Sequence, residues 1–130
     1  MSKIEIRHPD KPASAGPVSA GVLCDGWLFV SGQTPADPRT GKVTGTTIEE
    51  QTRATLGNID KILKAGGCSR QDVVKCGCHL ADMKDFERFS RTYAEFFSGS
   101  PVMPARITVQ SGMAGILVEI DAIARAPGKS

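Results

Sequence analysis

The stretch Pro104-Ala105-Arg106-Ile107-Thr108-Val109-Gln110, together with Leu117-Val118-Glu119-Ile120-Asp121-Ala122-Ile123-Ala124, decides how the fold is interpreted. Both segments are rich in β-branched residues, a composition typical of strands. Residues 111–116 separate them and include two glycines. A connection this short favours an antiparallel hairpin, so we expect the two strands to be neighbours in a sheet.

The hairpin assigns its side chains to two faces, because successive residues of a strand point to opposite sides. With the turn centred near Met113-Ala114, Arg106 lies opposite Asp121 and Thr108 lies opposite Glu119 on one face. The other face is expected to be core and carries Ile107, Val109, Val118, Ile120, Ala122 and Ala124. An arginine so placed is either half of a structural ion pair or a guanidinium suited to binding a substrate carboxylate through two hydrogen bonds.

The first part of the chain predicts an arm and a second hairpin. Residues 1–20 contain three prolines, which indicates a loop or an extended arm, and His8 within it is expected at the surface. Gly21–Cys24 and residues 27–31 read as strands, and Asp25-Gly26 between them is a pair that type I′ turns favour.

Gly32 follows this hairpin at the end of its second strand. A glycine there indicates a β-bulge, a plain strand terminus or a group that approaches the backbone closely. If a group approaches closely, the N–H of Gly32 could bind an anion.

Two helices are expected further along. The first begins at Thr47 and Glu50, which form a capping box, and apolar residues recur behind them at helical spacing. A strand over residues 73–81 and a second helix over residues 84–97 follow. The aromatic stripe of the second helix is typical of core.

Composition excludes several classes of protein. A chain of 130 residues forms a single domain, residues 1–130, with a core of its own. The net charge of +2 and the aromatic content of 5% disfavour a nucleic-acid partner. No apolar run is long enough for a membrane span, and the start is too polar for a signal peptide, so we expect a cytoplasmic protein.

The four cysteines, Cys24, Cys68, Cys76 and Cys78, match no zinc or redox spacing. Cys76 and Cys78 share one face of a strand and are interpreted as buried structural thiols. A metal site that includes His79 is the alternative, which strand alternation disfavours because it turns His79 to the opposite face.

The expected fold is α+β, with two helices on one face of a mixed sheet of five to six strands. The other face would carry Lys75, Gly77, His79, Arg106, Thr108, Glu119 and Asp121, mixed with Val73, Leu117 and Ile123. This mixed polarity suggests water or a partner subunit. A symmetric oligomer that buries this face would place Arg106 in a cleft between subunits.

Many blocks of the chain resemble, in order, the RidA (YjgF) family of enamine and imine deaminases, also described as endoribonuclease L-PSP or translation initiation inhibitor. The blocks include Gly16-Pro17, Leu28-Phe29-Val30-Ser31-Gly32-Gln33, Asp72-Val73-Val74-Lys75, Tyr93-Ala94-Glu95-Phe96-Phe97, Pro104-Ala105-Arg106 and Val118-Glu119-Ile120-Asp121-Ala122-Ile123-Ala124. The resemblance implies a chorismate-mutase-like fold and a homotrimer with clefts between subunits.

The resemblance also implies a reaction. Arg106 and the backbone N–H of Gly32 bind the carboxylate of a 2-aminoacrylate-type substrate, with Ser31, Val18 and Ser90 at the binding site. A water held by the carbonyl of Thr108 and by Asp121 attacks the imine carbon, and a 2-keto acid and ammonia leave. No metal or organic cofactor is implied.

Three site positions differ from the pattern of the best-known members: Val18 replaces a tyrosine, Ser90 an asparagine and Asp121 a glutamate. Two alternatives therefore stay open beside the deaminase. One is a trimeric protein that binds small carboxylates without turnover. The other is a specialised hydrolase of a catabolic pathway, similar to aminomuconate deaminases.

Overall fold

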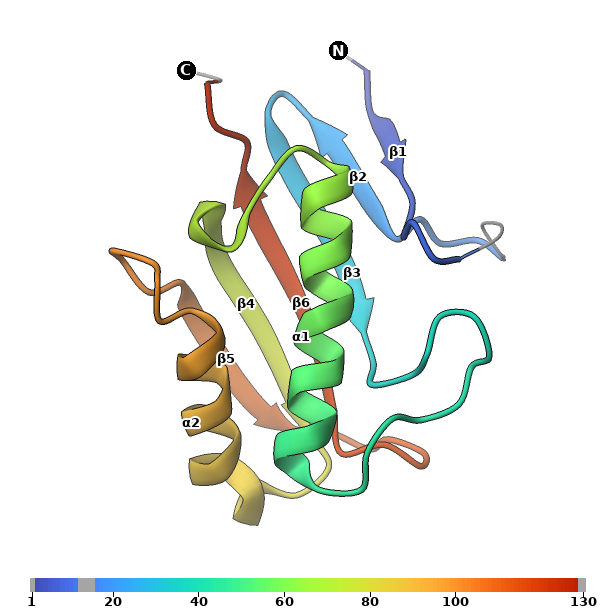
Figure 1. The fold of residues 1–130 in the computed structure, drawn as a ribbon, viewed down its shortest axis with the longest axis vertical. Coiled ribbons are helices and arrows are strands. Elements are labelled where there is room, and N and C mark those ends of the chain that lie inside the picture. Colours follow the sequence, from blue (N-terminus) through green and yellow to red (C-terminus); the bar gives the residue numbers. More distant parts are fainter. Residues whose placement is uncertain (1, 12–15, 129–130) are drawn as a thin grey trace.

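One mixed sheet organises the protein, which we describe from a computed structural model over residues 2–11 and 16–128. Its strands are β1 (Ile4–Ile6), β2 (Gly21–Cys24), β3 (Trp27–Gln33), β4 (Val73–Leu80), β5 (Ala105–Gln110) and β6 (Val118–Arg125). Their order across the sheet is β1-β2-β3-β6-β4-β5 (Figure 1). All neighbours are antiparallel except β4 and β5. The expected mixed sheet is confirmed, and β1 lies within the predicted arm.

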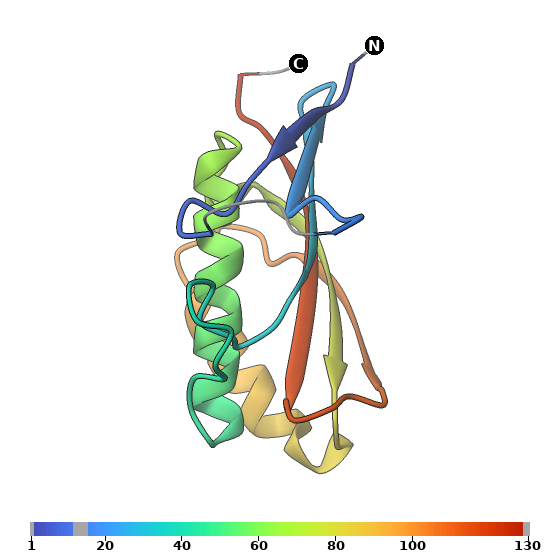
Figure 2. The ribbon, with the colours of Figure 1, turned by 90° about the vertical axis from the view of Figure 1, so that its right-hand side faces the viewer.

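Both helices cover the same face of the sheet (Figure 2). They are α1 (Ile48–Ala65) and α2 (Phe86–Phe96), and single 3₁₀ turns, η1 (Arg70–Asp72) and η2 (Met83–Asp85), precede β4 and α2. The predicted capping box opens α1, since Glu50 N–H donates to Thr47 Oγ1 at 3.1 Å and Thr47 N–H donates to Glu50 Oε1 at 3.1 Å. These reciprocal bonds satisfy donors that a helix start otherwise leaves unpaired.

The β2–β3 hairpin forms as predicted. Cys24 pairs with Trp27, and the two turn residues, Asp25 and Gly26, have φ angles of 54° and 80°. Two positive φ angles are the mark of a type I′ turn, whose twist matches that of the flanking strands.

The core lies between the helices and the sheet. Its fully buried side chains include Leu28, Leu56, Ile59, Ile62, Leu63, Cys76, Cys78, Leu80, Phe89, Phe97, Val118, Ile120 and Ala124. The uncovered face is partly apolar: Phe29, Ile107 and Val109 remain 46%, 57% and 38% exposed. No helix within the described residues combines the length and apolar composition that crossing a membrane requires.

The predicted hairpin of β5 with β6 is wrong. β5 pairs in parallel with β4 at the edge of the sheet, and β6 lies between β3 and β4. The reason is that the chain continues from β4 into α2, which packs on one face of the sheet. The connection through this helix brings the next strand, β5, back in the same direction as β4. The more apolar β6 then takes a central position, where Val118, Ile120, Ala122 and Ala124 are buried.

His8 also differs from expectation. It is 4% exposed, and its Nε2 lies 3.0 Å from Asn58 Oδ1 on α1. Its Nδ1 accepts a hydrogen bond from the backbone N–H of Asp10 at 3.1 Å. The arm is thus anchored on α1 through a partner 50 positions away, which no local pattern indicates.

Candidate functional site

Arg106 extends from the edge strand β5 toward α2, on the face that the helices cover. Its guanidinium carbon lies 4.8 Å from the ring centroid of Tyr93, 5.4 Å from that of Phe89 and 5.5 Å from that of Phe86. Nη2 donates to Ser90 Oγ at 3.0 Å. Within the described residues no carboxylate lies within 4.0 Å of it. Aromatic faces and one hydroxyl therefore orient a charge that is left available for an external anion.

Asp121 points to the opposite face of the sheet. The pairing of β4 with its two neighbours shows this. Cys76 of β4 pairs with Arg106 of β5, and the next residue, Gly77, pairs with Ile107 of β5 and with Asp121 of β6. Because side chains alternate, Arg106 shares the helix-covered face with buried Cys76, and Asp121 faces the uncovered side. The expectation that Arg106 and Asp121 meet on one face is wrong, since it rested on the incorrect hairpin.

Thr108 moves with Arg106 to the helix-covered face, beside Cys78. Its hydroxyl is buried and has no hydrogen-bond partner in the described part of the chain. Ile107 and Val109, which were expected in the core, point to the uncovered face instead. The backbone of Thr108 belongs to an edge strand, and such a strand leaves carbonyl and N–H groups unpaired on its outer side.

The carboxylate of Asp121 is held on the uncovered face by Gly77. The N–H of Gly77 donates to Asp121 Oδ1 at 2.9 Å. A Cβ on residue 77 would lie 2.6 Å from that oxygen, closer than real Cβ atoms approach. Glycine at this position therefore leaves room for the acid and also orients it.

Gly32 lies in a β-bulge and beside a carboxylate, so the bulge and the close approach are both confirmed. Val30 pairs with Ala122 and Gln33 with Ile120, which leaves Ser31 and Gly32 together opposite Asp121. A Cβ on residue 32 would lie 2.3 Å from Glu119 Oε2. The group that approaches Gly32 is thus Glu119.

Glu119 is a further candidate site residue, on the face where the sequence predicts it, for which no role was expected. Its alternation with Asp121 was the available signal. The aromatic contacts of Arg106 were also missed, because the stripe on α2 was interpreted as core alone.

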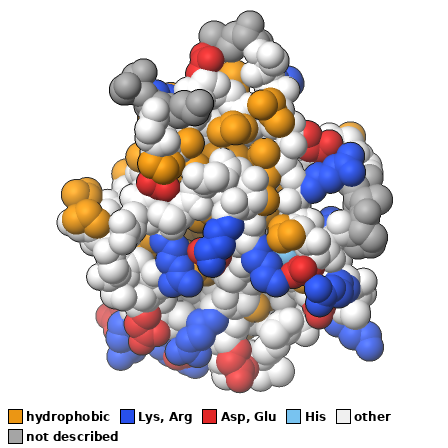
Figure 3. All heavy atoms as spheres, turned by 45° about the horizontal axis from the view of Figure 1, so that its top comes forward, with side chains coloured by type: hydrophobic (Ala, Val, Ile, Leu, Met, Phe, Trp, Pro, Cys, Tyr) orange, Lys and Arg blue, Asp and Glu red, His pale blue; other side chains and the backbone are white. Residues whose placement is uncertain are grey.

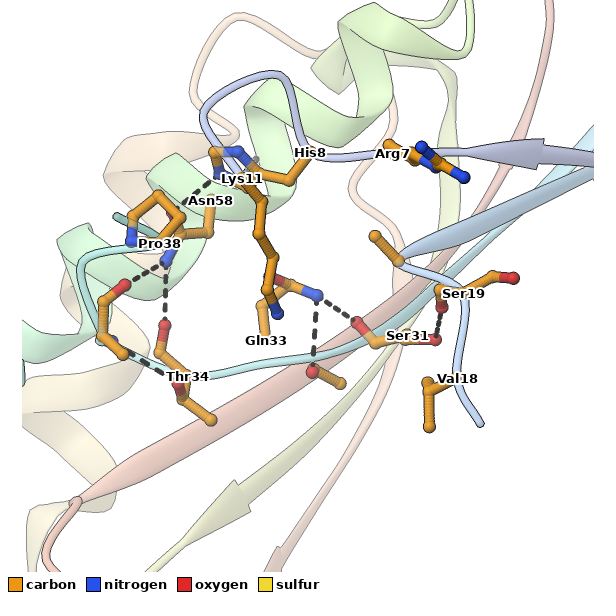
Figure 4. A pocket seen from close by; sticks show the side chains of 13 residues that line it. Arg7, His8, Lys11, Val18, Ser19, Ser31, Gln33, Thr34, Pro38 and Asn58 are labelled. Carbon is orange, nitrogen blue, oxygen red and sulfur yellow. Dashed lines mark hydrogen bonds between the residues drawn. The ribbon is translucent and has the colours of Figure 1, made fainter. Parts of the chain in front are cut away.

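A pocket of about 200 Å³ opens between β3, the arm and the start of the loop after β3 (Figure 4). Val18, Ser31 and Gly32 line it, and Ser31 Oγ donates to the carbonyl of Ser19 at 2.6 Å, which ties the wall together. Arg106, Ser90, Thr108 and Asp121 do not line this pocket. Within one chain the expected site residues therefore do not form a single site.

Nucleophilic roles for the buried thiols are disfavoured. Burial raises the pKa of Cys76 to about 11 and that of Cys78 to about 12. Burial also raises the pKa of Tyr93 far above its usual range. At neutral pH these groups are protonated, and a protonated thiol is a poor nucleophile and metal ligand.

His79 lies on the other face, as alternation predicts, and its Nδ1 is 2.7 Å from Ser111 Oγ. No cluster of three or more His, Cys, Asp or Glu residues among those described is arranged to hold a metal ion.

Comparison with known proteins places this geometry in a family. A family model described as Endoribonuclease L-PSP matches residues 8–126. A RutC family protein of Saccharolobus solfataricus is 44% identical over 124 residues, which cover 93% of this chain and 97% of that protein. A mouse protein named 2-iminobutanoate/2-iminopropanoate deaminase is 40% identical over 115 residues, covering 87% and 84%.

Solved structures agree. A Rid family protein of unknown function from Yersinia pestis superposes with a TM-score of 0.89 at 35% identity, covering 96% of this chain and all of that one. The six-stranded sheet with two helices on one face is thus the fold of these relatives, which confirms the expected fold class. The chain belongs to the RidA family, whose family model is described as Endoribonuclease L-PSP.

Proposed function

We propose that the protein hydrolyses reactive imines of 2-amino acids to 2-keto acids and ammonia. The observation that carries the proposal is Arg106, which α2 orients through Ser90 and three rings while no carboxylate of the described chain neutralises it. A planar guanidinium so prepared suits a substrate carboxylate, which it binds through two parallel hydrogen bonds. The deaminase names of the mouse and cattle relatives support the same chemistry.

The catalytic site is proposed to form between copies of the chain. Three strand spacings separate β3 from β5, roughly 14 Å, so Gly32 and Arg106 of one chain do not meet on one small substrate. The uncovered face exposes Phe29, Ile107 and Val109, an apolar surface of the kind that a partner covers. In a homotrimer, as the family resemblance implies, Arg106 of one copy would lie near the β-bulge at Gly32 of the next copy, and the two would form one substrate site.

The bulge supplies groups suited to the nitrogen end of the substrate. Glu119 and Asp121 lie beside Gly32, and their negative charges favour a protonated imine nitrogen there. Asp121 would take a proton from a water held near the carbonyl of Thr108, and that water would attack the imine carbon. Asp121 passes this proton to nitrogen and then takes the proton of the new hydroxyl as the C–N bond breaks, so that ammonia and a 2-keto acid leave. Positioning and proton transfer are enough for this chemistry.

A coupled assay tests the proposal. An amino-acid oxidase or threonine dehydratase generates the imine, and semicarbazide traps whatever the protein has not hydrolysed. The protein should lower the yield of semicarbazone, and Arg106→Ala should abolish the effect while Arg91→Ala, an exposed arginine of the same helix-covered side, should not. If the protein binds 2-keto acids through Arg106 but never lowers the yield, it is a carboxylate-binding protein and the deaminase proposal is wrong.

A further inference from the structure

The pocket beyond Gly32 is more basic than a small monocarboxylate substrate requires. Arg7 and Lys11 of the arm line it, and none of its lining residues is acidic. The surface seen in Figure 3 mixes charges, with Lys and Arg side chains lying among Asp and Glu side chains. Eight ion pairs join such groups in the described chain. The pocket departs from this balance.

Of the two cationic side chains that line this pocket, Lys11 is the one without an acidic partner among the described residues. Arg7 lies 3.4 Å from Glu5. The nearby Asp10 forms ion pairs with Arg39, at 3.0 Å, and with Lys61. The hydrogen bond from Lys61 lowers the pKa of Asp10. No ion pair within residues 2–11 and 16–128 includes Lys11. Figure 4 shows its side chain crossing the pocket from the arm toward the Gln33 side.

The backbone of Lys11 is tied to the buried His8, while the residue itself is exposed. Its N–H donates to the carbonyl of His8 at 3.1 Å. Because His8 Nδ1 accepts from a backbone N–H, its Nε2 is the nitrogen that donates to Asn58. The Asn58 amide in turn donates to the carbonyls of Thr34 and Ala36 at 3.0 Å each. This chain of hydrogen bonds joins the arm, α1 and the opposite wall, so it fixes the backbone from which the Lys11 side chain extends.

We propose that Lys11 binds a second, distal carboxylate of the substrate, so that the preferred substrates are imines of dicarboxylic 2-amino acids. This inference rests on the proposed function, which places the imine carbon beside Gly32. From there the substrate side chain has the pocket ahead of it, between Ser31 and the arm, with the ammonium of Lys11 across it. Val18, Ala20 and Pro38 contribute apolar surface for the intervening methylene groups.

Binding of two 2-keto acids of similar size tests the proposal by titration calorimetry. One is 2-oxoglutarate, with a distal carboxylate, and the other is 2-oxohexanoate, with an apolar tail. The wild-type protein should bind 2-oxoglutarate about fivefold more tightly, as one partly exposed ion pair provides. Lys11→Met, which keeps the length of the side chain, should reduce that ratio to about one. Lys42→Met, an exposed lysine outside the pocket, should keep it.

The outcomes separate the two ideas. Equal affinities for both ligands in the wild-type protein, or an unchanged ratio in Lys11→Met, would overturn this inference and leave the proposed function standing. Binding of neither ligand would remove the proposed function, and this inference with it. A preference that Lys11→Met removes and Lys42→Met keeps establishes the distal carboxylate subsite.

Discussion

Arg106 and Asp121 project from opposite faces of one sheet, although they were expected to face each other across a hairpin. The pairing of Gly77 shows that their faces differ. Gly77 pairs with Asp121 on β6 and with Ile107, not Arg106, on β5. A single small substrate between two such faces is excluded, because the backbone of the sheet separates them. If both residues serve one reaction, they must come from different copies of the chain.

Asp121→Asn tests the role of this acid. The amide oxygen can still accept the hydrogen bond from Gly77, so the fold is expected to persist, but the base is lost. We expect the deamination rate constant to fall by about 10²–10⁴, with 2-keto acid affinity within a few fold of wild type. Rate measurements in the semicarbazide assay and titration calorimetry give the two values. A variant with the wild-type rate would assign proton transfer to another group, of which Glu119 is the nearest candidate.

Ile107→Lys tests the assembly. Ile107 is 57% exposed on the uncovered face of the edge strand β5, and a charge there opposes burial against a second copy. We expect light scattering to report a trimer for the wild-type protein and a monomer for the variant, with deaminase activity lost in parallel. Val43→Lys, at a 44% exposed residue of the loop before α1, is the matched control and should stay trimeric. A wild-type monomer would contradict the intersubunit site.

Local structure was predictable because its causes are local. The capping box at Thr47, the type I′ turn at Asp25-Gly26 and the apolar stripe of α1 each depend on residues a few positions apart. The faces of β6 were also correct, since Val118 and Ile120 alternate with Glu119 and Asp121.

The order of the strands and the separation of Arg106 from Asp121 could not be predicted from local sequence patterns. Turn length suggested a β5–β6 hairpin, but the crossover through α2 decides which strand β5 joins. The error reversed both faces of β5 and moved Arg106 under α2. The alternation in β5 was misleading, because its apolar face, with Ile107 and Val109, is the exposed one, whereas the polar Arg106 and Thr108 lie on the helix-covered face. The burial of His8 depends on Asn58, a contact 50 residues distant.

The cysteines are expected to differ in reactivity. Burial holds the pKa of Cys76 near 11 and that of Cys78 near 12, whereas Cys24 is partly exposed. Iodoacetamide at pH 8 should therefore modify Cys24 first in the native protein, and all four thiols only after unfolding in guanidinium. Peptide mass spectrometry after timed quenching measures each site. Early modification of Cys76 or Cys78 would mean that β4 opens under native conditions.

Gly57 inside α1 and Gly66 at its C-cap are expected to respond oppositely to alanine. At Gly66, the C-cap, a Cβ would lie 2.6 Å from Leu28 Cδ2, and Leu28 is fully buried. Gly66→Ala should lower the free energy of unfolding by about 1–3 kcal/mol, because the core cannot shift freely. Gly57→Ala, inside the helix with nothing within 4 Å, should raise it by about 0.5–1 kcal/mol. Urea unfolding of both variants measures the difference, and equal effects would contradict the packing argument.

The ion pair of Glu49 with Arg88 should give the fold a defined acid dependence. Arg88 Nε and Nη2 donate to the two oxygens of Glu49 at 2.7 and 2.6 Å, which joins the first turn of α1 to α2. The hydrogen bond from Arg88 lowers the pKa of Glu49 from 4.5 to about 2. Because the unfolded chain takes up this proton at a higher pH than the folded one, the stabilisation is complete above pH 4.5 and is lost as the pH falls to about 2.

Comparison with Glu49→Gln isolates this effect. We expect the wild-type protein to be the more stable of the two at pH 7, and the gap in their urea midpoints to narrow progressively below pH 4.5. Glu87→Gln, at an exposed carboxylate of α2 that joins no ion pair within the described residues, is the control and should not reproduce the narrowing. A gap that stays constant between pH 7 and pH 3 would mean that the Glu49–Arg88 pair does not stabilise the contact between α1 and α2.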